Sequence, residues 1–270
     1  MDFADKGVVI TGGASGIGAA LARHIVSHGG RVCIADRDSE ATQLISDEIG
    51  AIHKVCDVRR EPEIVDLVAY AEDEFGQVDC FVSNAGVAAG QEGHAASASN
   101  DVWALNWEVH VMSHVYAARA CLPKMLERGA GYFVNVASAA GLLNQIDDAA
   151  YSATKHAAVS FAESLNITHG DQGIGVSVVC PQYVATPLIN LSDDDAAAHQ
   201  SLLTADEVAK TIVDGVSAGH FRILPHSQVA DYVVLRAQDP DRWLAGMRKL
   251  RAFAYSTFGQ PKAEDFYKLV

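Results

Sequence analysis

The chain has 270 residues, of which 49% are hydrophobic and 20% charged, enough for one large core without disulfides or metal ions. Its formal net charge of −14 argues against nucleic acid or an anionic membrane as a main partner. No apolar run approaches the roughly 20 residues that span a bilayer, and the start MDFADKG is acidic where a signal peptide would be basic. The five cysteines lack metal-binding spacing, so we expect a soluble, cytoplasmic protein in a reducing environment.

A strand, a glycine-rich turn and a helix are predicted at the N-terminus. The β-branched run at residues 7–10 leads into TGGASGIG, after which apolar residues recur at helical spacing. Glycines let the backbone approach a pyrophosphate closely, and the helix N-terminus offers free N–H groups and a positive dipole end. The pattern predicts a dinucleotide site whose contacts are Gly12, Ser15, Gly16, Ile17 and Gly18.

The second predicted strand, residues 31–36, ends at an acid. Asp36 lies eighteen residues after Gly18, near the spacing of a ribose-binding carboxylate. A carboxylate accepts hydrogen bonds from ribose hydroxyls but repels the 2′-phosphate of NADP, so NAD is the predicted cofactor. Arg37 follows directly and could attract a phosphate, although a solvated arginine at a turn is the simpler interpretation.

Five further strand-like runs alternate with helical stretches, at residues 51–56, 79–84, 132–137, 175–180 and 221–224. This alternation is typical of a parallel α/β sheet. No linker of Pro, Gly and Ser and no internal repeat suggests a second domain, so we expect one catalytic domain over residues 1–270.

The stretch YSATK indicates a proton-transfer site, because Tyr151 and Lys155 are one helical turn apart and about 6 Å apart along a helix axis. A phenol that works as a base near neutrality needs its pKa lowered by about 2 to 3 units, roughly 3–4 kcal/mol. One cation about 4 Å away supplies roughly that much at an effective dielectric near 20. The pair alone occurs by chance on many helices, so further evidence is required.

Five motifs occur in this order along the chain: TGGASGIG, Asp36, the NAG at residues 84–86, Ser138 and YSATK. Together they resemble the short-chain dehydrogenase/reductase family. The resemblance covers most of the first 190 residues, and the final third matches less well. It implies a Rossmann-like, doubly wound parallel seven-stranded sheet with helices on both faces. It also implies that Tyr151 is the general acid/base, that Lys155 lowers its pKa and binds the nicotinamide ribose, and that Ser138 positions the carbonyl or alcohol.

The same resemblance implies further cofactor contacts. Two of them, Asp57 and Val58, follow the third strand and resemble the family's adenine contacts. Three form the NAG segment: Asn84, Ala85 and Gly86. The last three lie in PQYVAT, which resembles the segment covering the nicotinamide: Pro181, Val184 and Thr186. Many relatives have glycine at position 182, so Gln182 is expected to reach toward the substrate instead.

The helix before the site departs from the family pattern. Relatives carry an Asn whose backbone carbonyl holds a water in a proton relay to the lysine, and counting back from LPKM at residues 122–125 reaches His110, with Asn106 one turn too early. The carbonyl of His110 could preserve that relay, its imidazole could add a group that titrates near neutral pH, or the residue could be packed without a catalytic part. His110 and His114 also have the i, i+4 spacing of metal ligands, but Val111 replaces the Glu of HExxH, so no metal site is predicted.

Specificity is expected from the least family-like segments. After the serine and after the last cofactor strand the chain places mostly apolar candidates, which favour a medium or large hydrophobic substrate: Ala140, Leu142, Leu143, Gln145, Ile146, Gln182, Tyr183 and Leu188. Residues 187–203 are expected to form a mobile substrate-side loop, and residues 227–270 a helical extension in which Asp239 and Pro240 start a helix. Along that helix Trp243, Met247, Leu250 and Ala254 form an apolar stripe. That extension either packs on its own subunit, covers the substrate cleft or joins a neighbouring subunit.

These features predict an NAD-dependent alcohol dehydrogenase or carbonyl reductase that acts on a small-molecule secondary alcohol or ketone. The family resemblance implies a homodimer or homotetramer. The alternative is a cofactor-bound scaffold or regulator with impaired catalysis, and His110 is the catalytic-region departure that favours it.

Overall fold

The computed structural model describes residues 1–88 and 93–269. Seven parallel strands form one sheet in the order β3-β2-β1-β4-β5-β6-β9. Each strand lies within a run that the sequence pattern predicted, or extends one residue beyond it: β1 Gly7–Thr11, β2 Arg31–Asp36, β3 Ile52–Val55, β4 Cys80–Ser83, β5 Gly131–Val136, β6 Ile174–Val179 and β9 Arg222–Ile223. The predicted doubly wound fold is therefore confirmed.

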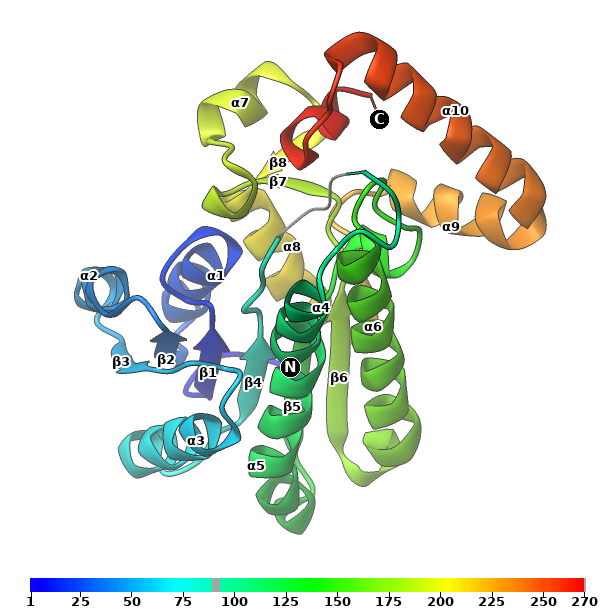
Figure 1. Cartoon of the computed structure of the whole chain (residues 1–270). Coiled ribbons are helices and arrows are strands. Elements are labelled where there is room, and N and C mark those ends of the chain that lie inside the picture. The colour runs from blue at the N-terminus through cyan, green and yellow to red at the C-terminus, as the bar shows by residue number, and fades with distance from the viewer. Residues whose placement is uncertain (89–92, 270) are drawn as a thin grey trace.

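Helices cover both faces of the sheet (Figure 1). One face packs against α3 (Glu61–Phe75), α5 (Ser113–Arg128) and α6 (Ala149–His169), and the other against α1 (Gly16–Ser27), α2 (Ser39–Ile49) and α8 (Ala205–Ser217). Successive strand residues point to opposite layers: Val9 and Phe81 lie in the first core, and Val8 and Val82 in the second. A sheet buried on both faces needs apolar residues at consecutive positions, which is why these strands read as continuous hydrophobic runs.

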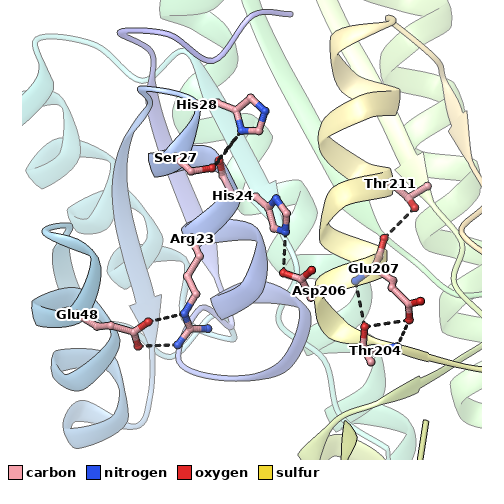
Figure 2. Close-up of polar contacts among 9 residues, drawn as sticks. All are labelled: Arg23, His24, Ser27, His28, Glu48, Thr204, Asp206, Glu207 and Thr211. Atoms are coloured by element: carbon pink, nitrogen blue, oxygen red, sulfur yellow. Dashed lines mark hydrogen bonds and ion pairs between the residues drawn. The ribbon is translucent and has the colours of Figure 1, made fainter. Parts of the chain in front are cut away.

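Figure 2 shows how α1 is held between its neighbours by polar contacts. Arg23 donates two hydrogen bonds of 2.6 Å to Glu48 of α2, and the His24 ring lies 2.8 Å from the Asp206 carboxylate of α8. A reciprocal capping box between Thr204 and Glu207 starts α8. These exposed pairs contribute little to stability, and they orient the helix whose N-terminus follows the glycine turn.

The strand order reverses between β1 and β4, because successive units are added outward in opposite directions from that point. In doubly wound sheets the carboxyl ends of the strands form a ligand crevice where the order reverses. Thr11 at the end of β1 and Ser83 at the end of β4 mark this point. The fold therefore provides a crevice at the edge where the sequence motifs end.

The segment expected to be a mobile loop contains regular structure. A 3-10 turn (η4, Pro187–Ile189) and a helix (α7, Asp193–Ala198) follow β7 (Tyr183–Ala185), which pairs in parallel with β8 (Leu202–Thr204). Three-residue strands are too short to show an alternating pattern. The run of aspartates forms the first turn of α7, where carboxylates favour the positive dipole end and Asp195 completes a capping box with Ser192.

Two helices and a 3-10 segment follow β9: α9 Gln228–Gln238, α10 Pro240–Phe258 and η5 Ala263–Leu269. The predicted helix start is confirmed, since the Asp239 carboxylate accepts a 2.9 Å hydrogen bond from the backbone N–H of Arg242. In Figure 1 these elements (orange to red) lie beyond the carboxyl ends of the strands. Tyr267 of η5 is buried in a cluster with Ala185 and Leu202, so the chain returns to the β7–β8 pair.

Candidate active site

The glycine turn after β1 is packed so tightly that side chains cannot replace its glycines. Gly12 has φ +64°, and a Cβ there would lie 2.7 Å from the Cα of Ala85. A Cβ on Gly18 would lie 2.2 Å from the carbonyl oxygen of Gly12. The Asn84 amide at the end of β4 donates hydrogen bonds of 3.1 and 2.9 Å to the carbonyls of Thr11 and Gly12. The turn is therefore rigid, and it leaves room for a ligand on the other side.

That other side is a cleft of about 400 Å³ at the carboxyl ends of the strands. It is lined by most of the residues that the sequence assigned to the cofactor: Gly12, Ser15, Gly16, Ile17, Asp36, Arg37, Asn84, Ala85, Gly86, Tyr151, Lys155, Pro181, Val184 and Thr186. A smaller hollow of about 100 Å³ shares Gly12, Asp36 and Gly86 with it and adds the two expected adenine contacts, Asp57 and Val58.

Gly18 is an exception among the expected cofactor contacts. It lines neither hollow, because it faces the Gly12 carbonyl and the Asn84 amide inside the turn. This glycine permits the close packing of α1 against the end of β1, which is a structural role rather than a ligand contact.

Asp36 ends β2 at the rim of both hollows. Its carboxylate accepts hydrogen bonds from the backbone N–H groups of Ala14 at 3.3 Å and Asp38 at 3.2 Å, which hold it in place. Asp57 is instead paired with Arg59 at 2.6 Å, and this pairing lowers the pKa of its carboxyl group. Asp36 is thus the carboxylate in this cleft whose orientation is set by the turn itself.

Ser138, Tyr151 and Lys155 converge in the same cleft from two elements. Ser138 follows β5, and its Oγ accepts a 3.1 Å hydrogen bond from the N–H of Ala140. Tyr151 and Lys155 lie one turn apart on α6, with the lysine Nζ 5.6 Å from the centre of the tyrosine ring. That Nζ is buried and donates a 3.1 Å hydrogen bond to the carbonyl of Val136.

The protonation of this pair differs from the sequence expectation. Burial raises the pKa of Tyr151 to about 12, while the neighbouring Ser138 hydroxyl opposes that rise. Burial also lowers the pKa of Lys155 to about 8. The sequence indicated the attraction of Lys155 and of a cationic cofactor but not this loss of water around the phenolate, so the lowering of the tyrosine pKa by Lys155 stays a prediction for the cofactor-bound protein. The phenol carries its proton at neutral pH.

His110 is fully buried against Tyr151, with the two rings edge to face and their centres 5.3 Å apart. Its Nε2 accepts a 3.1 Å hydrogen bond from the N–H of Val87, so the ring proton is on Nδ1, which lies 3.0 Å from the hydroxyl oxygen of Thr154. Burial and the charge of Lys155 hold the pKa of His110 well below its usual value. This burial favours the interpretation of His110 as a packed residue over that of a group titrating near neutral pH.

The backbone at His110 is a π-helical turn (η1, Glu108–Met112) between α4 (Asn100–Trp107) and α5. The N–H of Ser113 bonds to the carbonyl of Glu108, five residues back. Such turns are rare and frequently lie at functional sites. The sequence showed only a continuous helical pattern here, so the π turn could not have been anticipated.

Most of the expected substrate contacts lie around a second cavity of about 480 Å³ next to the cleft. Gln145, Gln182 and Tyr183 line both spaces, so the two meet there. Ala140, Leu143 and Ile146 line the second cavity, and Leu188 lines the cleft.

Leu142 is the exception among the expected substrate contacts, because it lines neither space. Its side chain packs in a cluster with Val229 and Leu224, and its carbonyl accepts a hydrogen bond from Arg236. Ala140, in the 3-10 turn after Ser138 (η2, Ala139–Gly141), and Leu143, just after that turn, line the cavity instead.

The far wall of the second cavity comes from the C-terminal segment. Trp243, Met247 and Leu250 belong to the apolar stripe seen in the sequence, whereas the sequence did not assign the remaining wall residues, Tyr232, Leu235, Arg242, Ala245, Gly246, Lys249, Phe266 and Leu269. Helical spacing could have located the apolar ones that lie on α9 and α10. No sequence signal distinguishes Arg242 and Lys249 from ordinary surface cations.

Comparisons with known proteins agree with this geometry. The family model described as short chain dehydrogenase matches residues 6–197. A 1-deoxy-11-beta-hydroxypentalenate dehydrogenase of Streptomyces exfoliatus is 31% identical over 257 residues, which cover 90% of each chain. A cis-4-hydroxycyclohexanecarboxylate dehydrogenase of Sinomonas cyclohexanicum is 34% identical over 78% of this chain and 88% of its own.

Two solved structures are also similar. A short chain dehydrogenase/reductase from Burkholderia phymatum in complex with NAD superposes with a TM-score of 0.81 at 31% identity, covering 89% of this chain and 96% of the other. An actinorhodin polyketide ketoreductase with NADPH has a TM-score of 0.73 at 31% identity, covering 83% and 97%. The two structures hold different nicotinamide cofactors.

Proposed function

The chain belongs to the short-chain dehydrogenase/reductase family, and on that premise we propose that it is an NAD(H)-dependent oxidoreductase interconverting a secondary alcohol and a ketone. The observation that carries the proposal is the convergence of Ser138, Tyr151 and Lys155 beside the glycine turn in one cleft. The cofactor, when bound, gives a hydride to the carbonyl carbon or takes one from the alcohol.

Tyr151 is the proposed general acid/base. Because its pKa is raised to about 12, the phenol is protonated at neutral pH and can donate that proton to the oxygen of a ketone as it gains negative charge. Ser138 positions that oxygen: its Oγ accepts from the Ala140 N–H, makes a long 3.5 Å hydrogen bond to the carbonyl of Pro181, and lies beside the Tyr151 hydroxyl. The serine hydroxyl can therefore turn from this weak contact to the substrate oxygen.

Lys155 is proposed to bind the nicotinamide ribose and to replenish the proton of Tyr151. With a pKa of about 8 its ammonium can exchange protons near neutrality. We propose that the relay reaches it through the backbone carbonyl of His110, which lies in the π turn. The His110 ring is a positioning group, since it connects the loop after β4 at Val87 to α6 at Thr154.

NAD is the proposed cofactor because Asp36 projects from the end of β2 into the cleft, where it favours ribose hydroxyls and repels a 2′-phosphate. The glycines of the turn leave the space that a pyrophosphate needs. Asp57, Val58 and the NAG segment surround the adenine side, and Val184 and Thr186 the nicotinamide side. Arg37 lies exposed at the rim and is proposed as a secondary contact.

The proposed substrate is medium or large and hydrophobic. The cavity that joins the cleft at Gln145 and Tyr183 is walled mainly by apolar and aromatic side chains and has room for a ring system or a long acyl chain. The relatives named for hydroxylated cyclic carboxylates support a substrate of this size. The C-terminal helices are proposed to cover this part of the site.

We also propose a cytoplasmic homodimer or homotetramer. Exposed Trp103 and Trp107 on α4 and Ile167 on α6 give the helices beside the active site an apolar outer surface. All five cysteines are free and buried, which suits a reducing compartment. In the described residues no helix is long and apolar enough to cross a membrane. Light scattering after size-exclusion chromatography tests the assembly, and a monomer contradicts it.

A substrate screen tests the function. Bulky ketones with NADH, and the corresponding alcohols with NAD, are expected to change the absorbance of the reduced nicotinamide. The alternative, a cofactor-bound scaffold, predicts NADH binding without turnover of any member of the panel.

A further inference from the structure

The second cavity carries an unusual charge for this protein. The chain has a formal net charge of −14, yet the described residues that line this cavity include two cations, Arg242 and Lys249, and no carboxylate. The remaining wall is apolar apart from the amides of Asn144, Gln145 and Gln182 and the hydroxyls of Tyr183 and Tyr232. An apolar space with cations alone at its edge is complementary to a ligand that has an apolar body and one anionic end.

Two neighbouring cations are held by protein partners, whereas Arg242 and Lys249 are not. Arg251 of α10 is paired with Asp147 at 2.8 Å, and Arg236 of α9 donates to the carbonyl of Leu142. Within residues 1–88 and 93–269, neither the Arg242 nor the Lys249 side chain forms an ion pair or a hydrogen bond. Arg236 and Arg251, which do not line the cavity, therefore stabilise the structure, while the two cations that line it are free to bind an anion.

Their position on α10 places them at one edge of the apolar stripe. Arg242 and Lys249 are seven residues apart, about two turns, so they lie on the same side of the helix about 10 Å apart along its axis. Three residues of the stripe, Trp243, Met247 and Leu250, line the cavity between and beside the two cations. Both cations are exposed, so their stems cover apolar surface while the charged ends remain at the solvent edge.

The opposite side of the cavity is the reaction centre. Gln145, Gln182 and Tyr183 line both the cavity and the cleft that holds Ser138 and Tyr151, so the two spaces meet at these residues. A ketone bound at Tyr151 would therefore extend its body past these residues toward α10. A substrate of sufficient length would bring its far end to the two cations.

We propose that the substrate is an amphipathic organic acid whose ketone or alcohol lies at Tyr151 and whose carboxylate lies against Arg242 and Lys249. This inference rests on the proposed function and specifies the substrate class of that site. Arg242 makes the stronger contact, because its planar guanidinium matches the two oxygens of a carboxylate. Lys249 adds a second positive charge at the same edge.

The test uses methyl-ketone fatty acids, in which a terminal methyl ketone and a carboxylate are joined by polymethylene chains of increasing length, and their methyl esters. With NADH, the wild-type protein is expected to reduce the acids with at least about tenfold higher kcat/KM than the esters at the best chain length. The preference should disappear for chains too short to reach α10, and should decrease at high salt because the cations are exposed.

Arg242→Gln is expected to lower kcat/KM for the best acid about tenfold, mainly through KM, and to leave its ester unchanged. Arg248→Gln is the matched control, since Arg248 is exposed on the same helix and removes the same charge without lining the cavity. Lys249→Gln should have a smaller effect in the same direction. Equal kcat/KM for acid and ester, or equal effects of the Arg242 and Arg248 substitutions, would overturn the proposal.

The ester separates this inference from the proposed function. Ester turnover without a preference for the acid refutes the carboxylate site alone, while failure to reduce any member of the panel refutes the proposed function. Binding of octanoate and of octanol, followed by isothermal titration, then decides the carboxylate site without catalysis. Tighter binding of octanoate that is lost in Arg242→Gln and kept in Arg248→Gln supports it, and equal binding of the acid and the alcohol rejects it.

Discussion

The two halves of the site are built in opposite ways. Around Tyr151 the polar groups are buried and held by short contacts: Lys155 donates to the carbonyl of Val136, and the Ser138 oxygen accepts from Ala140. Around α10 the wall is apolar, and its cations, Arg242 and Lys249, are exposed and unpaired within the described chain. Burial fixes the protonation and orientation of the first set, and solvent leaves the second set adjustable.

This difference separates chemistry from recognition. Proton transfer requires groups whose pKa values are set by the protein, which only burial and fixed partners provide. Recognition of varied substrates requires a surface that can change without disturbing those groups. Substitutions in the buried half should therefore alter the rate constant kcat or the folding stability, and substitutions in the α10 half should alter KM.

Tyr151→Phe should have the largest effect, because it removes the proton donor and leaves the ring. We expect kcat to fall by about 10²- to 10⁴-fold, while the dissociation constant for NADH, measured by fluorescence titration, stays within about twofold. Tyr183→Phe is the matched control: burial also raises the pKa of Tyr183 to about 12, but its hydroxyl donates to Gln145. Equal losses in both variants would refute the assignment of Tyr151.

Lys155→Met tests how much the burial of the lysine cation lowers the free energy of unfolding. Its pKa is about 8 in the folded chain and 10.5 in a free lysine, so between these pH values the unfolded chain binds a proton that the folded chain does not. The contribution of Lys155 to stability therefore becomes less unfavourable as pH rises from 8 to 10.5, and the cost is fully present below pH 8. The inactive variant should be more stable than wild type by about 2 kcal/mol at neutral pH, after allowance for the lost hydrogen bond.

Urea unfolding of both proteins across that pH range measures the effect. The stability difference should shrink as pH rises, and Lys262→Met, which changes an exposed lysine, should show no such trend. A difference between Lys155→Met and wild type that grows with pH would show that the folded protein favours the charged lysine.

Asp36→Ser probes the edge of the buried half, where the cleft meets solvent. Removal of the carboxylate should shift the ratio of kcat/KM for NADH to that for NADPH about tenfold toward NADPH, because the repulsion of a 2′-phosphate is lost. Arg37→Gln should instead change the ratio by less than about threefold. A wild-type protein that already prefers NADPH would contradict the proposed cofactor.

His110→Asn should have the smallest of these effects on the rate constant. Loss of the contacts to Val87 and Thr154 is expected to lower kcat by about threefold to tenfold through misplacement of Tyr151. The shape of the pH–rate profile should stay the same, since the imidazole is already neutral. Thr154→Ser, which keeps the hydroxyl, should retain most of the activity. A profile that loses a limb in His110→Asn would restore the imidazole as a titrating group.

Much of the buried half could be predicted from the sequence, because its functions need particular residue types at fixed spacing. Close backbone approach requires glycine in the turn, and one helical turn sets the separation of Tyr151 and Lys155. Burial opposes the expected lowering of the Tyr151 pKa, and the sequence could not show it: burial of a side chain depends on the whole fold, whereas the attraction of a cation four residues away can be estimated locally.

The α10 half was less accessible. Three-residue strands such as β7 and β8 form through their pairing with each other and carry no local pattern. Leu142 and Leu143 are both apolar and adjacent, and only the 3-10 turn decides which of them faces the cavity. The importance of Arg242 follows from the absence of an acidic partner among the described residues, which is a property of three-dimensional packing.

The central claim is hydride transfer to a carbonyl with a proton from Tyr151, and isotope transfer tests it most directly. The protein is incubated with NADH deuterated on the transferring face of the nicotinamide and with the ketone panel, and the alcohols are analysed by mass spectrometry. We predict one deuterium on the carbinol carbon of a product alcohol with the wild-type protein, and its loss in Tyr151→Phe. Tight binding of NADH with no deuterium in any alcohol would contradict the account and favour a scaffold.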